Sequence, residues 1–279
     1  MTIFLLKFQN HGLFALLGTN GAGKTTTIRM MLGILKKDSG KIIWNGKEVD
    51  RKNVNFGYLP EERGIYPKTK IVDQLEYFGR LKGLSKEEAL KSIDYWLDRL
   101  KMTEYKNEKA EKLSKGNQQK IQFITAIMHD PELIVLDEPF SGLDPVNTDI
   151  LKEVIIELVK KGKYIVMSSH QMNSIEELCQ DIVILNRGKT ILKGNLDEIK
   201  EAYKINKIEI QTKENISKYI EEGGLKLISK ENKKYIIAIE NKEQAEKLLK
   251  NIIDDGVKVE KFELIKPTLH EIFIEKVGE

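Results

Sequence analysis

A glycine-rich loop near the start of the chain has the residue types and spacing to bind phosphate. Residues 18–25, GTNGAGKT, fit the pattern G-x-x-x-x-G-K-[ST]. Glycines let backbone N–H groups turn toward an anion, and the N-terminus of the following helix favours negative charge. Lys24 is expected to reach the β- and γ-phosphates of a nucleotide, and the Thr25 hydroxyl to ligate Mg²⁺. The alternative is a glycine-rich turn with an incidental lysine and threonine. The expected phosphate contacts are Gly18, Asn20, Gly21, Ala22, Gly23, Lys24, Thr25 and Thr26.

Two adjacent carboxylates end a later apolar run. The segment 133–139, LIVLDEP, closes with Asp137 and Glu138 before a proline. At a strand end beside a phosphate-binding loop, one carboxylate can hold Mg²⁺ and its neighbour can polarise an attacking water. We therefore assign Asp137 to the metal and Glu138 to general-base work. An Asp-Glu-Pro run that only caps a strand is the alternative, and the loop upstream disfavours it.

A second possible anion site lies between these two motifs. Residues 113–123, LSKGNQQKIQF, place Ser114 and Gly116 before an amphipathic stretch. Ser114 is a good helix N-cap, and Gly116 would leave backbone N–H groups available at the helix start. Two anion sites imply either two phosphates or two subunits. An ordinary capped helix is the alternative for this segment taken alone.

The elements that must position these motifs follow an α/β pattern. Residues 12–18, GLFALLG, are typical of a parallel strand buried on both faces, and 24–35 predict a helix. Further buried strands and helices alternate up to residue 194. Between about residues 69 and 130 the apolar spacing is helical and no strand is predicted until 133. This pattern predicts a P-loop α/β core with a largely parallel sheet and a helical subdomain at 69–130.

The character of the sequence changes after Gly194. Residues from 207 onward predict the order β-α-β-β-α-β, a small α+β unit, and 266–279 predict a closing helix with proline in its first turn. We therefore expect two domains, at 1–200 and 201–279. The same order occurs in RNA-binding modules, which expose aromatic side chains on the sheet; here only Tyr219, Tyr235 and Phe262 are available.

Composition excludes several classes of protein. The 46 basic and 43 acidic residues are mixed along the chain and give a net charge of +3, without the one-signed stretch of a nucleic-acid binder. No apolar run approaches the ~20 residues that span a bilayer, so we expect any membrane role to come through a partner. The single Cys179 cannot form an internal disulfide.

The five motifs together resemble the nucleotide-binding subunit of an ABC transporter. They are the P-loop, LSKGN, LIVLDEP, SGLDP and SSH, in this order, and the likeness covers residues 13–194. In that family, the serine-glycine signature of one subunit closes over the γ-phosphate held by the P-loop of another, so two ATP molecules lie within a dimer. The resemblance implies that Ser114 and Gly116 act in trans, and that the chain is an ATPase using ATP and Mg²⁺.

The resemblance also assigns roles to the remaining motif residues. Asp144 in SGLDP corresponds to the loop that communicates across the dimer, and His170 to the switch histidine that contacts the γ-phosphate. The implied catalytic set is Lys24, Glu138 and His170, and the implied metal ligands are Thr25, Asp137 and Glu61. The implied partners are integral membrane permease subunits and a second ATPase subunit, either a copy or a paralogue, with no nucleic acid. The implied location is peripheral, on the cytoplasmic side of the cell membrane.

Three features depart from the family pattern. Glu61 stands where the family usually has glutamine, and LSKGN replaces the commoner LSGGQ. Both variants resemble those of the export branch that includes sodium- and drug-efflux ATPases, some of which carry a C-terminal accessory domain. Family members also carry a first strand and an adenine-stacking aromatic before this point, which this sequence is expected to lack. Phe4, Phe8 and His11 are the candidate substitutes.

Two other functions stay open at the level of sequence. One is an ABC-type ATPase that acts on nucleic acid or the ribosome, although such proteins usually carry two ATPase cassettes or a long coiled-coil insertion. The other is a truncated, nucleotide-responsive subunit that binds ATP weakly. The transported substrate is not encoded in an ATPase of this kind, since it does not line the transport path.

Overall fold

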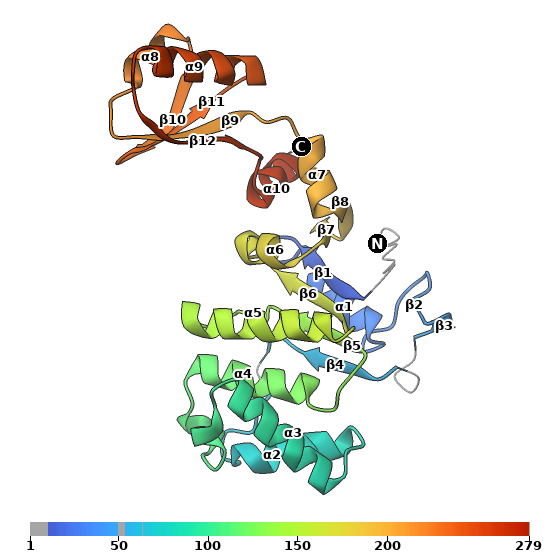
Figure 1. The fold of residues 1–279 in the computed structure, drawn as a ribbon. Coiled ribbons are helices and arrows are strands. Elements are labelled where there is room, and N and C mark those ends of the chain that lie inside the picture. The colour runs from blue at the N-terminus through green and yellow to red at the C-terminus, as the bar shows by residue number, and fades with distance from the viewer. Residues whose placement is uncertain (1–10, 50–53, 63, 279) are drawn as a thin grey trace. The chain divides into compact units, whose positions relative to one another are not determined.

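A computed structural model describes residues 11–49, 54–62 and 64–278 of the chain. The chain divides into two compact units, which meet in sequence between Gly194 and Asn195. The first unit is an α/β structure around a largely parallel sheet, and the second is a smaller α+β structure (Figure 1). The predicted fold class is confirmed.

A six-stranded sheet forms the centre of the first unit. Its strands, in spatial order, are β4 (Phe56–Leu59), β5 (Leu133–Asp137), β6 (Tyr164–Ser169), β1 (Gly12–Leu17), β7 (Asp181–Asn186) and β8 (Lys189–Asn195). β1 pairs in parallel with β6 and β7, and β5 pairs in parallel with β4 and β6. The central strands are short apolar runs that are buried along nearly their whole length, as both-face coverage by helices requires. The carboxyl ends of β1, β5 and β6 therefore meet at one edge.

Three helices and a hairpin complete the core of the first unit. The helices are α1 (Lys24–Met31), α5 (Pro145–Lys160) and α6 (Met172–Leu178), and the hairpin pairs β2 (Ile43–Trp44) with β3 (Lys47–Glu48). The hairpin turns at Asn45 and Gly46, which both have positive φ, as the Asn-Gly pair predicts. α1 begins directly after the glycine-rich loop, so this loop joins the end of β1 to a helix N-terminus.

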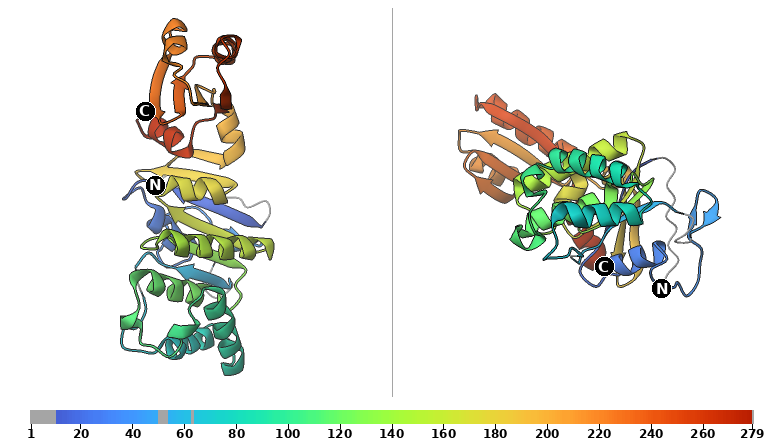
Figure 2. Two further views of the ribbon diagram at one scale, coloured as in Figure 1. Left: turned by 60° about the vertical axis from the view of Figure 1, so that its left-hand side comes forward. Right: turned by 90° about the horizontal axis from the view of Figure 1, so that it is seen from below.

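Three helices form one end of the first unit (Figures 1 and 2). They are α2 (Ile71–Leu81), α3 (Lys86–Arg99) and α4 (Lys115–Ile127), and we call them the helical layer. Two short 3₁₀ turns, η1 (Thr103–Tyr105) and η2 (Ala110–Lys112), connect α3 to α4. α2 and α3 are amphipathic and bury one apolar face each, as their spacing predicts. Ser85 closes a capping box with Glu88 at the start of α3.

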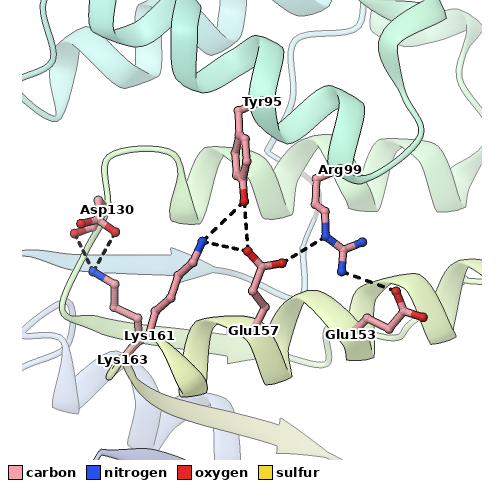
Figure 3. A network of polar contacts seen from close by, with 7 residues as sticks. All are labelled: Tyr95, Arg99, Asp130, Glu153, Glu157, Lys161 and Lys163. Atoms are coloured by element: carbon pink, nitrogen blue, oxygen red, sulfur yellow. Dashed lines mark hydrogen bonds and ion pairs between the residues drawn. The ribbon is translucent and has the colours of Figure 1, made fainter.

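Ion pairs fasten the helical layer to α5. Figure 3 shows Tyr95 and Arg99 of α3 converging on Glu157 of α5, with distances of 3.0 Å from the tyrosine hydroxyl and 3.1 Å from Nε of Arg99. Lys161 also lies 2.8 Å from Glu157. Hydrogen bonds from Lys161, and then from Arg99, lower the pKa of Glu157 to about 2. This carboxylate therefore stays charged and keeps the two helices together at neutral pH.

The second unit is a four-stranded antiparallel sheet with helices on one face (Figure 1). In spatial order its strands are β10 (Lys226–Glu231), β11 (Lys234–Ala238), β9 (Lys207–Thr212) and β12 (Val259–Ile265). α8 (Ser217–Glu222) and α9 (Lys242–Asp254) pack on the sheet, while α7 (Leu196–Ala202) precedes it and α10 (Leu269–Gly278) follows it. The chain order β9-α8-β10-β11-α9-β12 is the predicted split arrangement.

Two details of the second unit refine the sequence analysis. Tyr219 and Tyr235 are buried in the core of this unit and Phe262 packs against it partly buried, so these aromatics do not form an exposed stacking surface. Pro267 lies before α10, not within its first turn. Thr268 occupies the capping position, because its hydroxyl accepts from the N–H of Glu271 and its own N–H donates to the Glu271 carboxylate.

Candidate nucleotide site

The predicted phosphate-binding loop has the backbone conformation that its glycines allow. Gly23 caps α1 with a φ of 102° in the left-handed region, which other residues rarely adopt. A Cβ atom at Gly18 would lie 2.5 Å from the carbonyl oxygen of Leu185, so no larger residue fits there. The first N–H groups of α1, beginning at Lys24, have no partner within the helix and are available to an anion.

Lys24 is 7% exposed and folds back over this loop. Its Nζ donates to the carbonyl oxygen of Gly18 at 2.9 Å and to that of Thr19 at 3.3 Å. The same ammonium lies 3.7 Å from Oε1 of Glu138. The positive charge is therefore held at the mouth of the loop, where the γ-phosphate of a nucleotide would need it.

A buried serine fixes the two carboxylates at the end of β5. Asp137 is paired in register with Ser168 of β6, and both side chains are fully buried. The Ser168 hydroxyl donates to Oδ1 of Asp137 and accepts from the N–H of Glu138 at 3.1 Å. Glu138 itself has a φ of 52°, a left-handed conformation that is uncommon for a glutamate. The backbone N–H of Glu138 is held in this conformation by the hydroxyl and the carbonyl oxygen of Ser168.

One carboxylate oxygen of Glu138 lies close to both Lys24 and His170. Nδ1 of His170 lies 2.9 Å from Oε1 of Glu138, and Nζ of Lys24 lies 3.7 Å from the same atom. Glu138 is 6% exposed, whereas the side chain of His170 is half exposed. The structure thus brings Lys24, Asp137, Glu138 and His170 together at the carboxyl edge of the sheet.

Asp137 has the free ligand atom that a magnesium site needs. Its Oδ2 is buried and accepts no hydrogen bond from the part of the chain that the structure describes, although an unpaired buried carboxylate oxygen is costly. Mg²⁺ in nucleotide sites is commonly held by one or two protein oxygens together with phosphate oxygens and water. Oδ2 of Asp137 is one oxygen that could serve in such a site, and the hydroxyl of Thr25, in the first turn of α1, stays the second predicted ligand.

Glu61 lies two residues beyond β4 and is exposed. It makes no hydrogen bond or ion pair with any other described residue. Its neighbour Glu62 lies 3.7 Å from Arg29 of α1. Glu61 is therefore available to a ligand but is not held by side-chain contacts.

The second predicted anion site is built separately from the first. The Ser114 hydroxyl accepts from the N–H of Asn117 at 3.2 Å and caps α4. Asp144 caps α5 by accepting from the backbone N–H of Asn147 at 2.9 Å and from its side chain at 2.6 Å. Both Asn147 bonds lower the pKa of Asp144. Among the described residues, no bond joins Ser114 or Asp144 to Lys24, Asp137 or Glu138.

Gly116 packs against the loop that precedes Asp144. A Cβ atom there would lie 3.3 Å from the carbonyl oxygen of Gly142 and 3.3 Å from the side chain of Leu143. The Ser114 segment and the Asp144 segment of one chain therefore lie next to each other. Of the candidates for adenine contact, His11 is exposed just before β1, and Phe4 and Phe8 lie outside the described residues.

Sequence reasoning missed four buried polar residues that support this site: Ser168, Gln119, Lys120 and Gln122. Ser168 is the first residue of the SSH motif, and its bond to Asp137 cannot be read from the motif because it depends on strand register. The other three follow the signature in QQKIQ and look like solvent-facing positions of an amphipathic helix. The sequence does contain one signal for them: these polar residues are interspersed with Ile121 and Phe123, so the helix has no clear polar face.

Comparisons with known proteins agree with the geometry. A family model described as ABC transporter matches residues 4–141, and one described as ATP-binding protein DrrA1-3-like, C-terminal domain, matches residues 194–277. An ABC transporter ATP-binding protein of Alkalihalophilus pseudofirmus is 48% identical over 94% of this chain and 98% of its own length. The chain belongs to the ABC transporter ATP-binding family. It is an ATPase that uses ATP and Mg²⁺.

Two further matches extend over much of the ABC ATPase. The ABC transporter ATP-binding protein YhaQ of Bacillus subtilis is 48% identical over 98% of this chain and 92% of its own length. A solved structure described as the ATP-binding subunit of an ABC transporter aligns with a TM-score of 0.63 and 32% identity, over 69% of this chain and 82% of that one. None of the helices in the described part of the chain has the length and apolarity that a bilayer crossing requires.

Proposed function

We propose that this ABC ATPase is the motor subunit of a multi-subunit exporter. ATP binding closes a dimer of ATPase subunits, hydrolysis reopens it, and separate membrane permease subunits carry the substrate. The chain would sit peripherally on the cytoplasmic side of the membrane. The observation that carries the proposal is the cluster at Glu138, where Lys24 and His170 meet one carboxylate oxygen beside the uncommitted Oδ2 of Asp137.

Within one chain, the cluster supports a specific division of labour. Lys24 and the loop from Gly18 to Thr26 hold the phosphates, and Thr25, Asp137 and Glu61 hold the metal. Mg²⁺, when bound, neutralises charge on the phosphates. Glu138 accepts a proton from the attacking water, and its contacts with His170 and Lys24 hold the carboxylate in place at the carboxyl edge of the sheet. His170 contacts the γ-phosphate from the exposed side of the cluster.

Ser114, Gly116 and Asp144 act on the nucleotide of the second subunit. Support comes from their separation from the P-loop cluster and from the packing of Gly116 against the loop before Asp144. Two trans-acting segments held side by side can present one surface to a neighbouring P-loop. The second subunit is a copy of this chain or a paralogue.

Export is the favoured direction because of two sequence features. Glu61 and the LSKGN signature resemble variants of the efflux branch, and the second unit matches a C-terminal domain model of a DrrA1-3-like ATP-binding protein. Action on nucleic acid has less support, because Tyr219 and Tyr235 lie in the core of the second unit and Phe262 is partly buried against it.

Two serines with the same local role provide a test. Ser114 and Ser85 each cap a helix of the helical layer through a 3.2 Å bond from a backbone N–H. Ser114→Ala and Ser85→Ala should each cost about 1 kcal/mol of stability, as lost N-caps do. In the Glu138→Gln background, sedimentation at saturating MgATP should show a dimer for Ser85→Ala and for the parent, and a monomer for Ser114→Ala. If the Glu138→Gln chain without a serine substitution stays monomeric, two copies of this chain do not close on ATP, and the second subunit is a paralogue.

A further inference from the structure

The helix that follows the signature buries three polar side chains in succession. Gln119, Lys120 and Gln122 of α4 are 2%, 3% and 5% exposed. Burying an amide or an ammonium costs free energy unless it is hydrogen-bonded, and the side-chain nitrogen of each of these residues has two acceptors. Oε1 of Gln122 is buried and has no hydrogen-bond partner among the described residues. Each of the three donates to a different segment outside α4.

Gln122 binds the loop that carries Glu61. Its Nε2 donates to the carbonyl oxygen of Pro60 at 3.2 Å and to that of Glu62 at 2.8 Å. The two acceptors lie on either side of Glu61, whose own side chain is exposed. Gln122 therefore fixes the backbone of this loop at both neighbours of the glutamate.

Gln119 and Lys120 make equivalent bonds to two other segments of the site. Nε2 of Gln119 donates to the carbonyl oxygen of Pro139 at 3.2 Å, directly after Glu138. Nζ of Lys120 donates to the side chain of Asn147 at 2.8 Å, and Asn147 in turn donates to Asp144. From three directions around its axis, α4 thus holds backbone or side-chain groups next to Glu61, Glu138 and Asp144.

The packing of α4 makes these bonds rigid. A Cβ atom at Gly57 of β4 would lie 1.8 Å from the carbonyl oxygen of Ala126, so the strand and the helix are in backbone contact. β4 leads directly into the Glu61 loop, and α4 begins at the Ser114 cap. A displacement of the loop is therefore transmitted to the signature, because little slack separates the two elements.

We propose that Gln122 is a positioning residue for Glu61. Its two bonds hold the Glu61 loop where that carboxylate reaches metal bound at Asp137, and they tie the loop to the helix that presents Ser114 to the second subunit. The inference rests on the proposed roles of Glu61 and Ser114. It adds a physical connection between two nucleotide sites: the loop that contacts the metal of one site is tied to the signature that acts on the nucleotide of the other site.

The test measures how strongly Mg²⁺ improves ATP affinity in the full chain carrying Glu138→Gln. ATP is titrated in EDTA and in excess Mg²⁺, and the ratio of the two dissociation constants is the Mg²⁺-dependent gain. Glu61→Ala should reduce this gain about 3- to 10-fold, the effect of losing one or two hydrogen bonds or metal contacts. Gln122→Met, which keeps the length of the side chain and removes the donor, should reduce it by the same factor.

The double variant distinguishes positioning from a general effect. If Gln122 acts through Glu61, the variant with both substitutions should lose no more of the gain than either single variant. Thr125→Val, which removes a hydroxyl bonded only within the same helix, should leave the gain unchanged. Gln122→Ala provides a second donor-free variant in case the methionine prevents folding.

Three results would overturn the inference. One is additive losses in the double variant, and another is a loss of affinity for Gln122→Met that is equal with and without Mg²⁺. The third is a normal gain in Gln122→Met when Glu61→Ala has lost it, which would leave the proposed role of Glu61 standing. A normal gain in Glu61→Ala would instead contradict the role of Glu61 in the proposed function, and the positioning role of Gln122 with it.

Discussion

The two units of the chain use buried polar side chains differently. Among the described residues, ten such side chains lie in the first unit and two in the second. In the first unit, Lys24, Gln119 and Gln122 bind backbone carbonyls of loops at strand ends. In the second, Glu209 is bound by the side chains of Lys234 and Lys261 on its own sheet, and Thr212 donates to the carbonyl oxygen of Lys258, which precedes β12 and lies outside the predicted nucleotide site.

The difference shows two reasons for which a polar side chain is buried. A side chain that binds the backbone of a loop fixes where that loop lies, which a reactive site requires and an apolar core cannot supply. A carboxylate paired with lysines on one sheet face adds only to the stability of that sheet. The comparison predicts that substitutions in the first unit change nucleotide binding, whereas those in the second change stability alone.

The largest expected effect is on nucleotide affinity. Lys24→Met should weaken ATP binding roughly 10- to 100-fold, because it removes a charged hydrogen-bond donor from the phosphates. Glu209→Gln should leave ATP affinity unchanged. Equilibrium titration of both variants measures the contrast, and a matching loss in Glu209→Gln would break the comparison between the units.

The next largest effect is expected on the free energy of unfolding, at the contact between β4 and α4. Gly57→Ala forces a methyl group against the Ala126 carbonyl and should cost about 1–3 kcal/mol or more of unfolding free energy. Gly12→Ala is the matched control, because a Cβ atom at this strand position meets no atom of the described residues within 4 Å. Urea unfolding should leave Gly12→Ala within about 0.5 kcal/mol of the parent. Equal losses of unfolding free energy in the two variants would show that the backbones of β4 and α4 do not lie this close together.

The smallest expected effect is a pH dependence in the second unit. Hydrogen bonds from Lys234 and other neighbours lower the pKa of Glu209 to about 2. Because the unfolded state binds this proton more readily, the contribution of Glu209 is complete above its ordinary pKa of about 4.3 and is lost as pH falls toward 2. Thermal unfolding should therefore show Glu209→Gln less stable than the parent at pH 6, by up to about 1 kcal/mol, with the gap narrowing below pH 4 and closing only near pH 2. A gap that stays constant from pH 6 down to pH 2 would assign the effect to packing.

Much of the fold could be predicted because its signals are local. Buried apolar runs before Gly18 and Asp137, and helical spacing between residues 69 and 130, follow from the periods of the elements themselves. The split order of the second unit follows from the same patterns. The closing helix was predicted with Pro267 inside its first turn, and the Thr268 capping box was missed.

The supporting residues of the site could not be predicted because they depend on distant pairing. Ser168 reaches Asp137 only because β5 and β6 pair in that register. Gln122 reaches the Glu61 loop only because Gly57 lets α4 touch β4. Local sequence gives the polarity of these residues but not the loop that each one binds.

The central claim is that the Glu138 cluster hydrolyses ATP. The most direct test is steady-state ATP hydrolysis by the Glu138→Gln chain beside the parent at saturating MgATP. The predicted result is a fall in turnover of roughly 10²–10⁴, as for the loss of a general base, with MgATP still bound in the micromolar range, about −8 kcal/mol. Unchanged turnover in a chain that binds MgATP normally would contradict the account.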